Sequence, residues 1–543
     1  MIRSGLILLI VVASLLAAST WRVFGHTWDE PEHLAAGMEL VDRGKYEFDT
    51  EHPPLARALI ALGPHLAGSH SFGTPPPDGT QEGVDILYDG GHYDRTLALA
   101  RLGALPFLAV LLFSMWLWAR RVAASEGEAL LAVLLLACVP PIIGHAALAA
   151  LDIPGTATTL LALYLLQHWL VSGLRRDSIL FGLAAGVAFG TKLSAIPFIG
   201  LGMLVLLLLR AFLSVAPAAV SAQRRVAGLA LMALATLVPI TLAYGLSGLQ
   251  VVSLPPRFNW VMVYLFQNAG AADQPFYRFI ENLHLPAAWW NFAEGVMALK
   301  AHNDTGHVSF LLGNVKAGGW WYFYLVALAV KTPLPLLLSG SVGLYLLARD
   351  GLRQANTWRM APVVLFVTLL VFASVFSRIN IGIRHVLILY PFLAMAGAYA
   401  LASAWRALPR VGTAVAALLA AWQVSTLGTA YPDYFPYFNE SVSNPAHVLV
   451  DSDLDWGQDL RRLERRLVEL KVPSVSLAYQ GTADLTREVL PPFVRLPPRQ
   501  PATGWVAINA LTREHEPIGY AWLNSYRPVE RVGKTIDLYF IAP

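Results

Sequence analysis

Apolar segments long enough to cross a membrane dominate this sequence. Of its 543 residues, 56% are hydrophobic and only 14% are charged, whereas a typical soluble domain has roughly a quarter charged residues. A transmembrane helix needs about 20 mostly apolar residues. Segments of about that length lie at 5–24, 96–118, 129–149, 155–173, 178–191, 193–210, 227–247, 323–347, 360–377, 385–404 and 411–430. The sequence therefore predicts a polytopic α-helical membrane protein with about eleven transmembrane helices.

Short basic loops indicate which helix ends face the cytoplasm, because such loops tend to stay on that side. They contain Arg3, Arg120–Arg121, Arg175–Arg176, Arg224–Arg225, Arg349, Arg353, Arg359, Arg406 and Arg410. Since Arg175–Arg176 and Arg224–Arg225 are both expected inside, an even number of crossings separates them. We therefore expect two short helices broken at Gly190–Lys192, and not one tilted helix.

This topology puts the N-terminus inside and the longer polar segments outside, in a multi-pass protein of the inner (plasma) membrane. The outer segments are the loops 25–94 and 248–322, the turns near 152, 191 and 378–384, and the tail 431–543. Arg3 followed by apolar Leu6–Ala18 also fits a signal peptide. We expect a retained first span, because the acidic loop that follows has to stay at the membrane surface.

The composition changes after residue 430, which divides the chain into a transmembrane module, 1–430, and an extracytoplasmic domain, 431–543. Four segments have the pattern of strands: Val448–Val450, Ser474–Tyr479, Trp505–Asn509 and Ile536–Ile541. Asp459–Leu470 has the apolar stripe of a helix. The tail is therefore predicted to be a small α/β domain.

Charge and cysteine content exclude several classes of protein. The net charge is +3 without a clustered basic face, so no nucleic-acid partner is expected. The single cysteine, Cys138, lies in an apolar run, which excludes an intramolecular disulfide and a cysteine-rich metal site.

Carboxylates next to apolar segments are the first candidate functional residues, because charge beside hydrocarbon is costly and is retained for a reason. Asp29 and Glu30 end the first span, and Asp152 stands between the apolar runs 146–151 and 153–170. Asp29 and Glu30 could instead be solvated loop acids. Asp152 could be the N-cap of the following helix, which is compatible with a functional role.

Basic residues on the same outer side form a second group. Lys192 lies at the expected helix break, Arg384 and His385 open the tenth span, and Lys331 lies within the eighth. Such groups suit a phosphate. The alternatives are a lysine that snorkels to the interface and a charged flank.

The segment Glu51–Leu55 places a carboxylate and an imidazole before a rigid Pro-Pro turn. His52 could contact a phosphate, or Glu51 and His307 could hold a divalent metal. A further acidic run, Asp451, Asp453, Asp455 and Asp459, lacks the glutamate of a calcium loop. It is typical of a helix N-terminus, with contacts to an acceptor sugar, including stacking on Trp456, as the alternative.

Together these motifs resemble GT-C glycosyltransferases of the protein O-mannosyltransferase and lipid A aminoarabinose transferase type. Asp29-Glu30 is similar to the acidic motif of that superfamily, and Glu51-His52-Pro53-Pro54-Leu55 is similar to the Glu-Lys-Pro-Pro-Leu of the aminoarabinose transferases. Asp152 corresponds by context to the second acid, and Arg384-His385 to the late basic motif. Further similarities to bacterial members are Gly306-His307, Gly319-Trp320-Trp321-Tyr322 and Lys331-Thr332-Pro333. The resemblance covers roughly 1–430.

The resemblance implies a membrane glycosyltransferase that uses a polyprenyl-phosphate-linked sugar, with an inverting mechanism and a protein, lipid or glycan acceptor. Asp29 would be the general base, with Glu30 and Asp152 orienting the base or the acceptor. Lys192, Arg384, His385, His52 and Lys331 would bind the donor phosphate. No cofactor is expected to be required, although a divalent metal at Glu51 and His307 stays an alternative.

Two other functions fit the same outward-facing charges. A transporter or flippase of a lipid-linked or polar substrate would use them as a binding site, but it should have symmetric halves, which the sequence does not show. A non-catalytic assembly subunit would use the outer domain to bind a partner.

Overall fold

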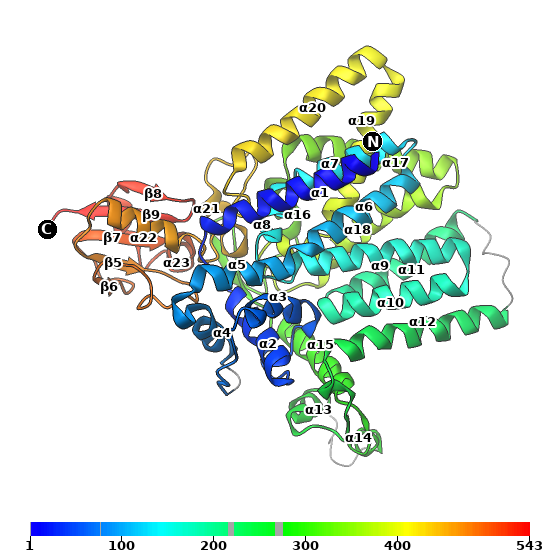
Figure 1. Ribbon diagram of the computed structural model, residues 1–543. Helices are drawn as coiled ribbons and strands as arrows, with labels where there is room; N and C mark the ends of the chain where they lie inside the picture. The colour runs from blue at the N-terminus through cyan, green and yellow to red at the C-terminus, as the bar shows by residue number, and fades with distance from the viewer. Residues whose placement is uncertain (1, 76–77, 215–221, 267–274) are drawn as a thin grey trace.

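The computed structural model describes residues 2–75, 78–214, 222–266 and 275–543. Long helices lie side by side in one bundle, and a small sheet domain is attached at one end of it, on the left in Figure 1. The structure is therefore mostly helical, with a mixed α/β unit at the C-terminus, as the sequence predicts.

All eleven apolar segments are helical over most of their length. They form α1 (Ile2–Ser19), α5 (Tyr93–Ala104) with α6 (Pro106–Val122), α7 (Glu126–Ala137) with α8 (Pro140–Ala146), α9 (Asp152–Ser172), α10 (Arg175–Thr191), α11 (Ala195–Phe212), α12 (Ala222–Ala243), α16 (Phe323–Lys331) with α17 (Leu334–Arg353), α18 (Thr357–Phe376), α19 (Leu389–Ala407) and α20 (Pro409–Ala430). Within the described chain, six helices are long and apolar enough to cross a membrane, or up to eight if each of two bent pairs is one span. Helices α9, α10 and α19 complete the bundle without meeting that criterion.

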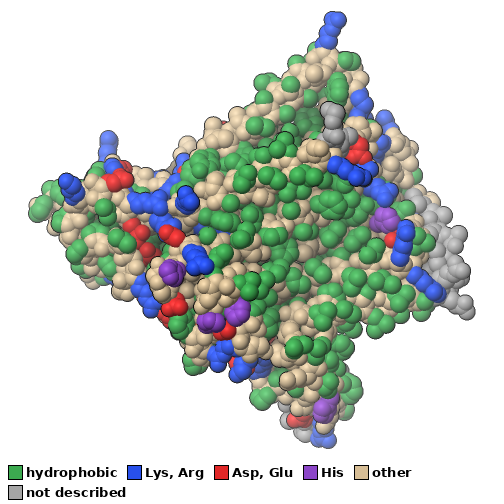
Figure 2. Space-filling view, in the orientation of Figure 1, with side chains coloured by type: hydrophobic (Ala, Val, Ile, Leu, Met, Phe, Trp, Pro, Cys, Tyr) green, Lys and Arg blue, Asp and Glu red, His purple; other side chains and the backbone are tan. Residues whose placement is uncertain are grey.

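The surface of the bundle has the polarity expected of a multi-pass membrane protein. Figure 2 shows a broad band of hydrophobic side chains over the helices, with Lys and Arg gathered along the right-hand edge, where α6 and α9 end. Many of the large hydrophobic side chains of α1 and α11 are exposed, among them Leu8, Leu15 and Leu208. These side chains are expected to contact lipid, because exposing so much apolar surface to water would cost free energy.

The predicted break between the fifth and sixth segments is confirmed. Helix α10 ends at Thr191, Lys192 has an extended backbone, and α11 begins at Ala195. The break turns the chain back into the bundle and leaves the Lys192 side chain at its end.

The segments between the long helices form most of the end that carries the sheet domain. They include α2 (Glu30–Arg43), α3 (Pro54–Leu66), α4 (Gly79–Tyr88), α13 (Asn259–Phe266), α14 (Pro275–Glu281), α15 (Ala287–Thr305), the hairpin of β3 (Val308–Leu311) with β4 (Asn314–Ala317), and the short pair of β1 (Val251–Val252) with β2 (Leu285–Pro286). Helix α3 begins at Pro54, as the Pro-Pro motif predicts. Proline is favoured there because its missing N–H would have no partner in the first turn.

The C-terminal unit is a five-stranded sheet with the order β6-β5-β7-β9-β8. Its strands are β5 (Val475–Ala478), β6 (Phe493–Arg495), β7 (Gly504–Asn509), β8 (Glu530–Val532) and β9 (Ile536–Ile541). Strand β5 pairs in parallel with β6 and β7, while β9 is antiparallel to β7 and β8. Helix α22 (Leu460–Glu469) packs its leucine stripe on this sheet.

The segment 431–459 lies against the helix bundle before the chain enters the sheet. Asn439 Nδ2 donates to the carbonyl of Ala329 at 2.6 Å. The strand predicted at Val448–Val450 is wrong, because α21 (Pro445–Val448) occupies its start. Val450 is instead buried with Phe310 and Leu511, where the bundle and the sheet domain meet. Burial between two units explains an apolar run that is not a strand.

Close packing of α17 on α19 depends on a glycine. A Cβ atom at Gly343 would lie 1.8 Å from the carbonyl oxygen of Ala396, so the two backbones can approach only without a side chain there. At Gly200, on α11, an added Cβ would meet nothing within 4 Å.

We therefore expect Gly343→Ala to destabilise the protein by about 1–3 kcal/mol through overpacking. Gly200→Ala is the matched control, because it makes the same chemical change in open space and should leave the unfolding temperature unchanged or slightly raised. Thermal unfolding of both variants in detergent measures the difference. Equal unfolding temperatures would contradict the described contact between α17 and α19.

Candidate active-site cavity

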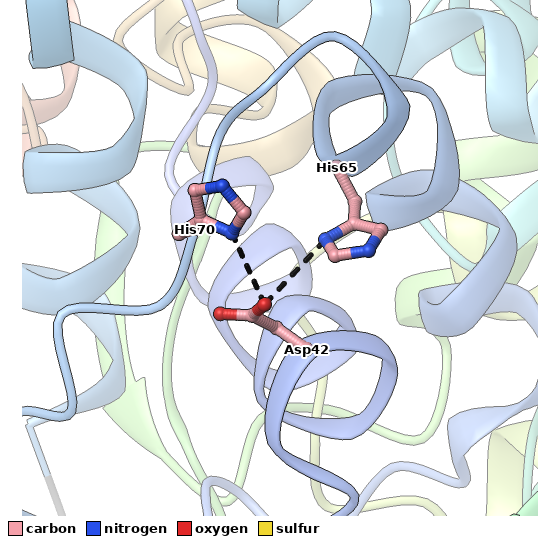
Figure 3. Close-up of side chains that lie close together, drawn as sticks. All are labelled: Asp42, His65 and His70. Atoms are coloured by element: carbon pink, nitrogen blue, oxygen red, sulfur yellow. Dashed lines mark hydrogen bonds and ion pairs between the residues drawn. The ribbon is translucent and has the colours of Figure 1, made fainter.

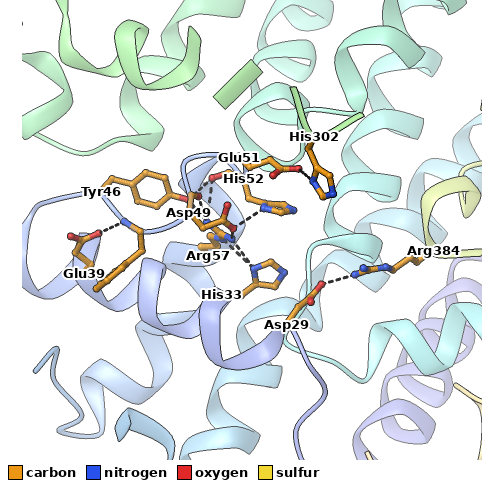
Figure 4. Close-up of polar contacts among 11 residues, drawn as sticks. Asp29, His33, Glu39, Tyr46, Asp49, Glu51, His52, Arg57, His302 and Arg384 are labelled. Carbon is orange, nitrogen blue, oxygen red and sulfur yellow. Dashed lines mark hydrogen bonds and ion pairs between the residues drawn. The ribbon is translucent and has the colours of Figure 1, made fainter. Parts of the chain in front are cut away.

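A cavity of about 700 Å³ opens where α2, α9, α11, α15 and the turn after α18 meet. Its charged and imidazole lining comes from distant parts of the chain: Asp29, Glu32, His33, Asp49, Glu51, His52, Asp152, Lys192, Lys300, His302, His307, Arg384 and His385. Figure 4 shows several of these side chains around one space. Most residues selected from the sequence therefore lie in one cavity.

Asp29 and Arg384 form an ion pair at one wall. Arg384 Nη1 donates to Asp29 Oδ2 at 2.6 Å, and the guanidinium lies 4.3 Å from the centre of the Trp456 ring. The Nε atom of Arg384 is buried without a hydrogen-bond partner among the described residues, and so is Nε2 of His385. Two neighbouring groups thus keep unused hydrogen-bonding capacity at the cavity.

Asp152 lies in a second ion pair, with Lys192. Lys192 Nζ donates to Asp152 Oδ1 at 2.7 Å, and His145 Nδ1 lies 3.3 Å from Asp152 Oδ2. Asp152 is the first residue of α9, while the N-cap is Leu151, so the predicted N-cap role is wrong. Gly155 makes room for the lysine, because a Cβ there would lie 2.8 Å from Lys192 Cδ.

The loop before α3 contributes a compact acid–imidazole group. His52 Nδ1 lies 2.8 Å from Asp49 Oδ2, and the buried Arg57 bonds to the same carboxylate and to Nδ1 of His33. Burial alone would raise the pKa of Asp49, but Arg57 and His52 hold it well below its usual range. Since Arg57 donates to Nδ1 of His33, that ring is a neutral imidazole with its proton on Nε2.

Glu51 pairs with His302 of α15, with 2.7 Å between Glu51 Oε1 and His302 Nδ1. His307 also lines the cavity, and its Nδ1 bonds to the Val308 carbonyl at 2.7 Å. The His302 and His307 ring centres are 6.0 Å apart. The structure thus places Glu51 and His307 in the same cavity, and metal binding there stays a prediction.

Glu32, in the first turn of α2, lines the cavity. It has no ion pair or hydrogen bond to any described residue, and it follows Asp29 by three positions. Burial, with Asp49 nearby, raises its pKa to about 6. Glu32 belongs to the acidic segment that follows the first span. The sequence predicts no separate role for it, although the i, i+3 spacing from Asp29 could have indicated one. His302 belongs to a cluster of polar side chains with Asn303, Asp304 and His307 in the loop 248–322. His33, Asp49 and Arg57 have no comparable signal in the sequence.

Glu30 lies outside the cavity. It is buried and accepts hydrogen bonds from Arg101 Nε at 2.8 Å and from the backbone N–H groups of Thr27 and Ala149, both at 2.8 Å. Burial would raise the pKa of Glu30, but Arg101 and these N–H groups keep it below its usual value. Glu30 therefore fastens the loop that carries Asp29 and does not line the cavity.

Lys331 also lies outside the cavity lining. Its ammonium is buried, donates to the carbonyls of Phe435 at 3.1 Å and Asp453, and lies 4.5 Å from the Phe438 ring centre. These contacts hold the segment 431–459 on α16, so Lys331 has a structural role and not the expected contact with phosphate.

The acidic run after residue 450 packs against the turn that carries Arg384. Asp453 Oδ1 accepts a hydrogen bond from the backbone N–H of Ile383 at 3.0 Å, and this fixes the short helix η6 (Ile383–Val386) that carries Arg384. Trp456 is buried between Arg384 and Phe435, so the alternative in which a sugar stacks on Trp456 is wrong. The ring supports the guanidinium instead.

Two long helices supply an apolar wall. Ile196, Pro197 and Phe198 come from the start of α11, and Phe372, Ala373 and Phe376 come from the end of α18. Both helices can cross a membrane by length and composition. Charged groups and lipid-facing helices therefore share one cavity.

Comparisons with known proteins give structural similarity only. No protein-family model and no curated protein sequence matches the chain. The archaeal oligosaccharyltransferase AglB from Archaeoglobus fulgidus, solved with an inhibitory peptide and a dolichol-phosphate, has a TM-score of 0.46 at 14% identity over 78% of this chain and 55% of its own. ArnT from Cupriavidus metallidurans, bound to undecaprenyl phosphate, has a TM-score of 0.46 at 14% identity, over 98% of this chain and 97% of its own.

A protein O-mannosyltransferase complex from S. cerevisiae, bound to its sugar donor, has a TM-score of 0.34 at 17% identity over 45% of this chain and 32% of its own. All three are GT-C glycosyltransferases, the superfamily that the motifs resemble. This chain spans about half the length of the archaeal enzyme. At these TM-scores the similarity does not assign a function, which has to come from the cavity itself.

The Glu51–His302 ion pair gives the cavity a pH-dependent contact. The hydrogen bond to Glu51 raises the pKa of His302 above its ordinary value of 6.5. The stabilisation is therefore complete below that ordinary pKa and is lost as the pH rises through the raised pKa.

We expect Glu51→Gln to lower the unfolding temperature more at pH 6 than at pH 8.5. Glu47→Gln is the matched control, because Glu47 is an exposed acid of the same loop, and its effect should be equally small at both values. Thermal unfolding in detergent checks this. An effect of Glu51→Gln that does not change with pH would show that the charged pair does not form.

Proposed function

We propose that this chain is a membrane glycosyltransferase that transfers a sugar from a polyprenyl-phosphate donor to an acceptor at the extracytoplasmic face of the plasma membrane. The observation that carries the proposal is the cavity of about 700 Å³, which combines carboxylates, cations and an apolar wall. A sugar-phosphate with a lipid tail needs all three. The arrangement therefore fits this class of substrate better than a purely polar or purely apolar ligand.

The donor phosphate would bind at the cationic side of the cavity. Arg384 and His385 have buried nitrogen atoms without partners in the described chain, and a phosphate oxygen is a strong acceptor for such groups. Lys192 and His52 line the same cavity. The polyprenyl tail would then lie along the apolar residues of α11 and α18, within the apolar part of the membrane.

The transfer would be a single displacement with inversion at the anomeric carbon. An acceptor hydroxyl attacks that carbon, its proton passes to Asp29, and the bond from the carbon to the phosphate oxygen breaks. Arg384, 2.6 Å from Asp29, would neutralise the negative charge that develops on the leaving phosphate. Asp152, held by Lys192, would orient the acceptor, which is a protein, lipid or glycan.

We expect Asp29→Asn to reduce transfer from a purified polyprenyl-phosphate sugar by about 10²- to 10⁴-fold, the usual contribution of a general base. Glu32→Gln is the matched control, because Glu32 is a second carboxylate of the same cavity and should cost less than about tenfold. Product formation by the purified variants, with unfolding temperatures measured in parallel, checks this.

Large loss with Glu32→Gln and little with Asp29→Asn would assign the base to Glu32. If the protein moved the lipid-linked sugar across vesicle membranes without forming any glycosidic product, it would be a transporter and not an enzyme.

We expect Arg384→Ala to weaken the binding of polyprenyl phosphate by roughly 10- to 100-fold, because charged hydrogen bonds to the phosphate contribute about 1.5–3 kcal/mol. Arg378→Ala is the control, since Arg378 lies in the same turn, is exposed and is outside the cavity lining. Titration of the purified protein with a fluorescent polyprenyl phosphate measures both. Equal affinities would place the phosphate elsewhere.

A further inference from the structure

A second cluster of ionisable side chains lies outside the cavity. Asp42 is in the last turn of α2, His65 is near the end of α3, and His70 is in the loop that follows (Figure 3). The cavity residues Asp29 and His52 are at the opposite ends of these two helices. Asp42 follows Asp29 by thirteen positions along α2, which is on the order of 20 Å.

The three side chains point their ligand atoms at one another, as Figure 3 shows. Asp42 Oδ1 lies 3.1 Å from His70 Nδ1 and 3.7 Å from His65 Nδ1, and one atom from each residue falls within 4.8 Å of the others. In a tetrahedral zinc site with bonds of about 2.0–2.1 Å, ligand atoms are roughly 3.3 Å apart. The two distances to Asp42 bracket that value.

Hydrogen bonding alone does not satisfy this cluster. Nδ1 of His65 is buried without a hydrogen-bond partner among the described residues. The other oxygen of Asp42, Oδ2, already accepts the backbone N–H of Ser71 at 2.9 Å. Two imidazole nitrogens thus face one carboxylate oxygen, and a metal ion between the three atoms could bind all of them.

The loop that carries His70 is held in place by other contacts. The Glu82 carboxylate accepts hydrogen bonds from Ser71 Oγ at 2.7 Å and from the backbone N–H groups of Phe72 at 2.8 Å and Thr74 at 3.2 Å. These bonds fix the loop without any contribution from His70. The imidazole is therefore positioned in advance, which lowers the cost of binding an ion.

We propose that Asp42, His65 and His70 bind a divalent transition-metal ion, with Zn²⁺ as the natural fit and water in the fourth position. Two imidazole nitrogens and one carboxylate oxygen suit zinc, and a water ligand completes a tetrahedral site. The ion fastens the loop after α3 to the far ends of α2 and α3. It thereby braces the helix pair whose other ends carry Asp29 and His52.

The test is zinc binding by the full-length protein in detergent, purified without a polyhistidine tag, stripped with a chelator and reloaded with Zn²⁺ alone. We expect His70→Ala and Asp42→Asn each to lose one bound zinc per chain, or to bind it at least tenfold more weakly. His92→Ala is the matched control, because His92 is an exposed histidine of the same region outside the cluster, and it should bind like the unmodified protein.

Two further measurements separate this site from the cavity and from misfolding. Glu51→Gln with His307→Ala removes the cavity ligands and should leave the zinc at Asp42 in place. The unfolding temperature without zinc should be the same for His70→Ala and the unmodified protein, because the His70 side chain is 65% exposed, while added zinc should raise it only in the latter. Equal zinc content and affinity in all variants would overturn the proposal.

Discussion

The ion pair between Asp29 and Arg384 is the contact on which the cavity depends. It joins the loop after the first helix to the turn after α18, which is 355 residues away along the chain. Trp456, from the segment that leads to the sheet domain, covers the guanidinium from the other side. A charge beside the membrane has to be paired and shielded, so three separate regions must assemble before Arg384 can be held at the cavity.

The same requirement explains why the charged residues divide into two kinds. Glu30 accepts several hydrogen bonds, and Lys331 donates to two backbone carbonyls. Both are buried with these partners, and both serve the architecture. Arg384 and His385 keep buried nitrogen atoms without partners in the part of the chain that the structure describes. Because buried polar atoms are normally satisfied, such exceptions indicate where a ligand is expected.

Local pattern predicted much of the fold and less of the cavity. The apolar segments, the break at Lys192 and the start of α3 at Pro54 follow from hydropathy and from the chemistry of proline and basic loops. The sequence could not distinguish Glu30 from Glu32, because the difference is made by Arg101, 71 residues away. The sequence likewise does not predict that Lys331 donates to backbone carbonyls more than 100 residues further along the chain.

We propose that this one cavity holds a lipid-linked phosphate between Arg384 and the apolar wall of α11 and α18. The most direct measurement is an experimental structure of the protein with a bound polyprenyl phosphate. We expect the phosphate within hydrogen-bonding distance of Arg384 and the first isoprene units against Phe198 and Phe372. A phosphate bound elsewhere, with the cavity occupied by solvent, would contradict it.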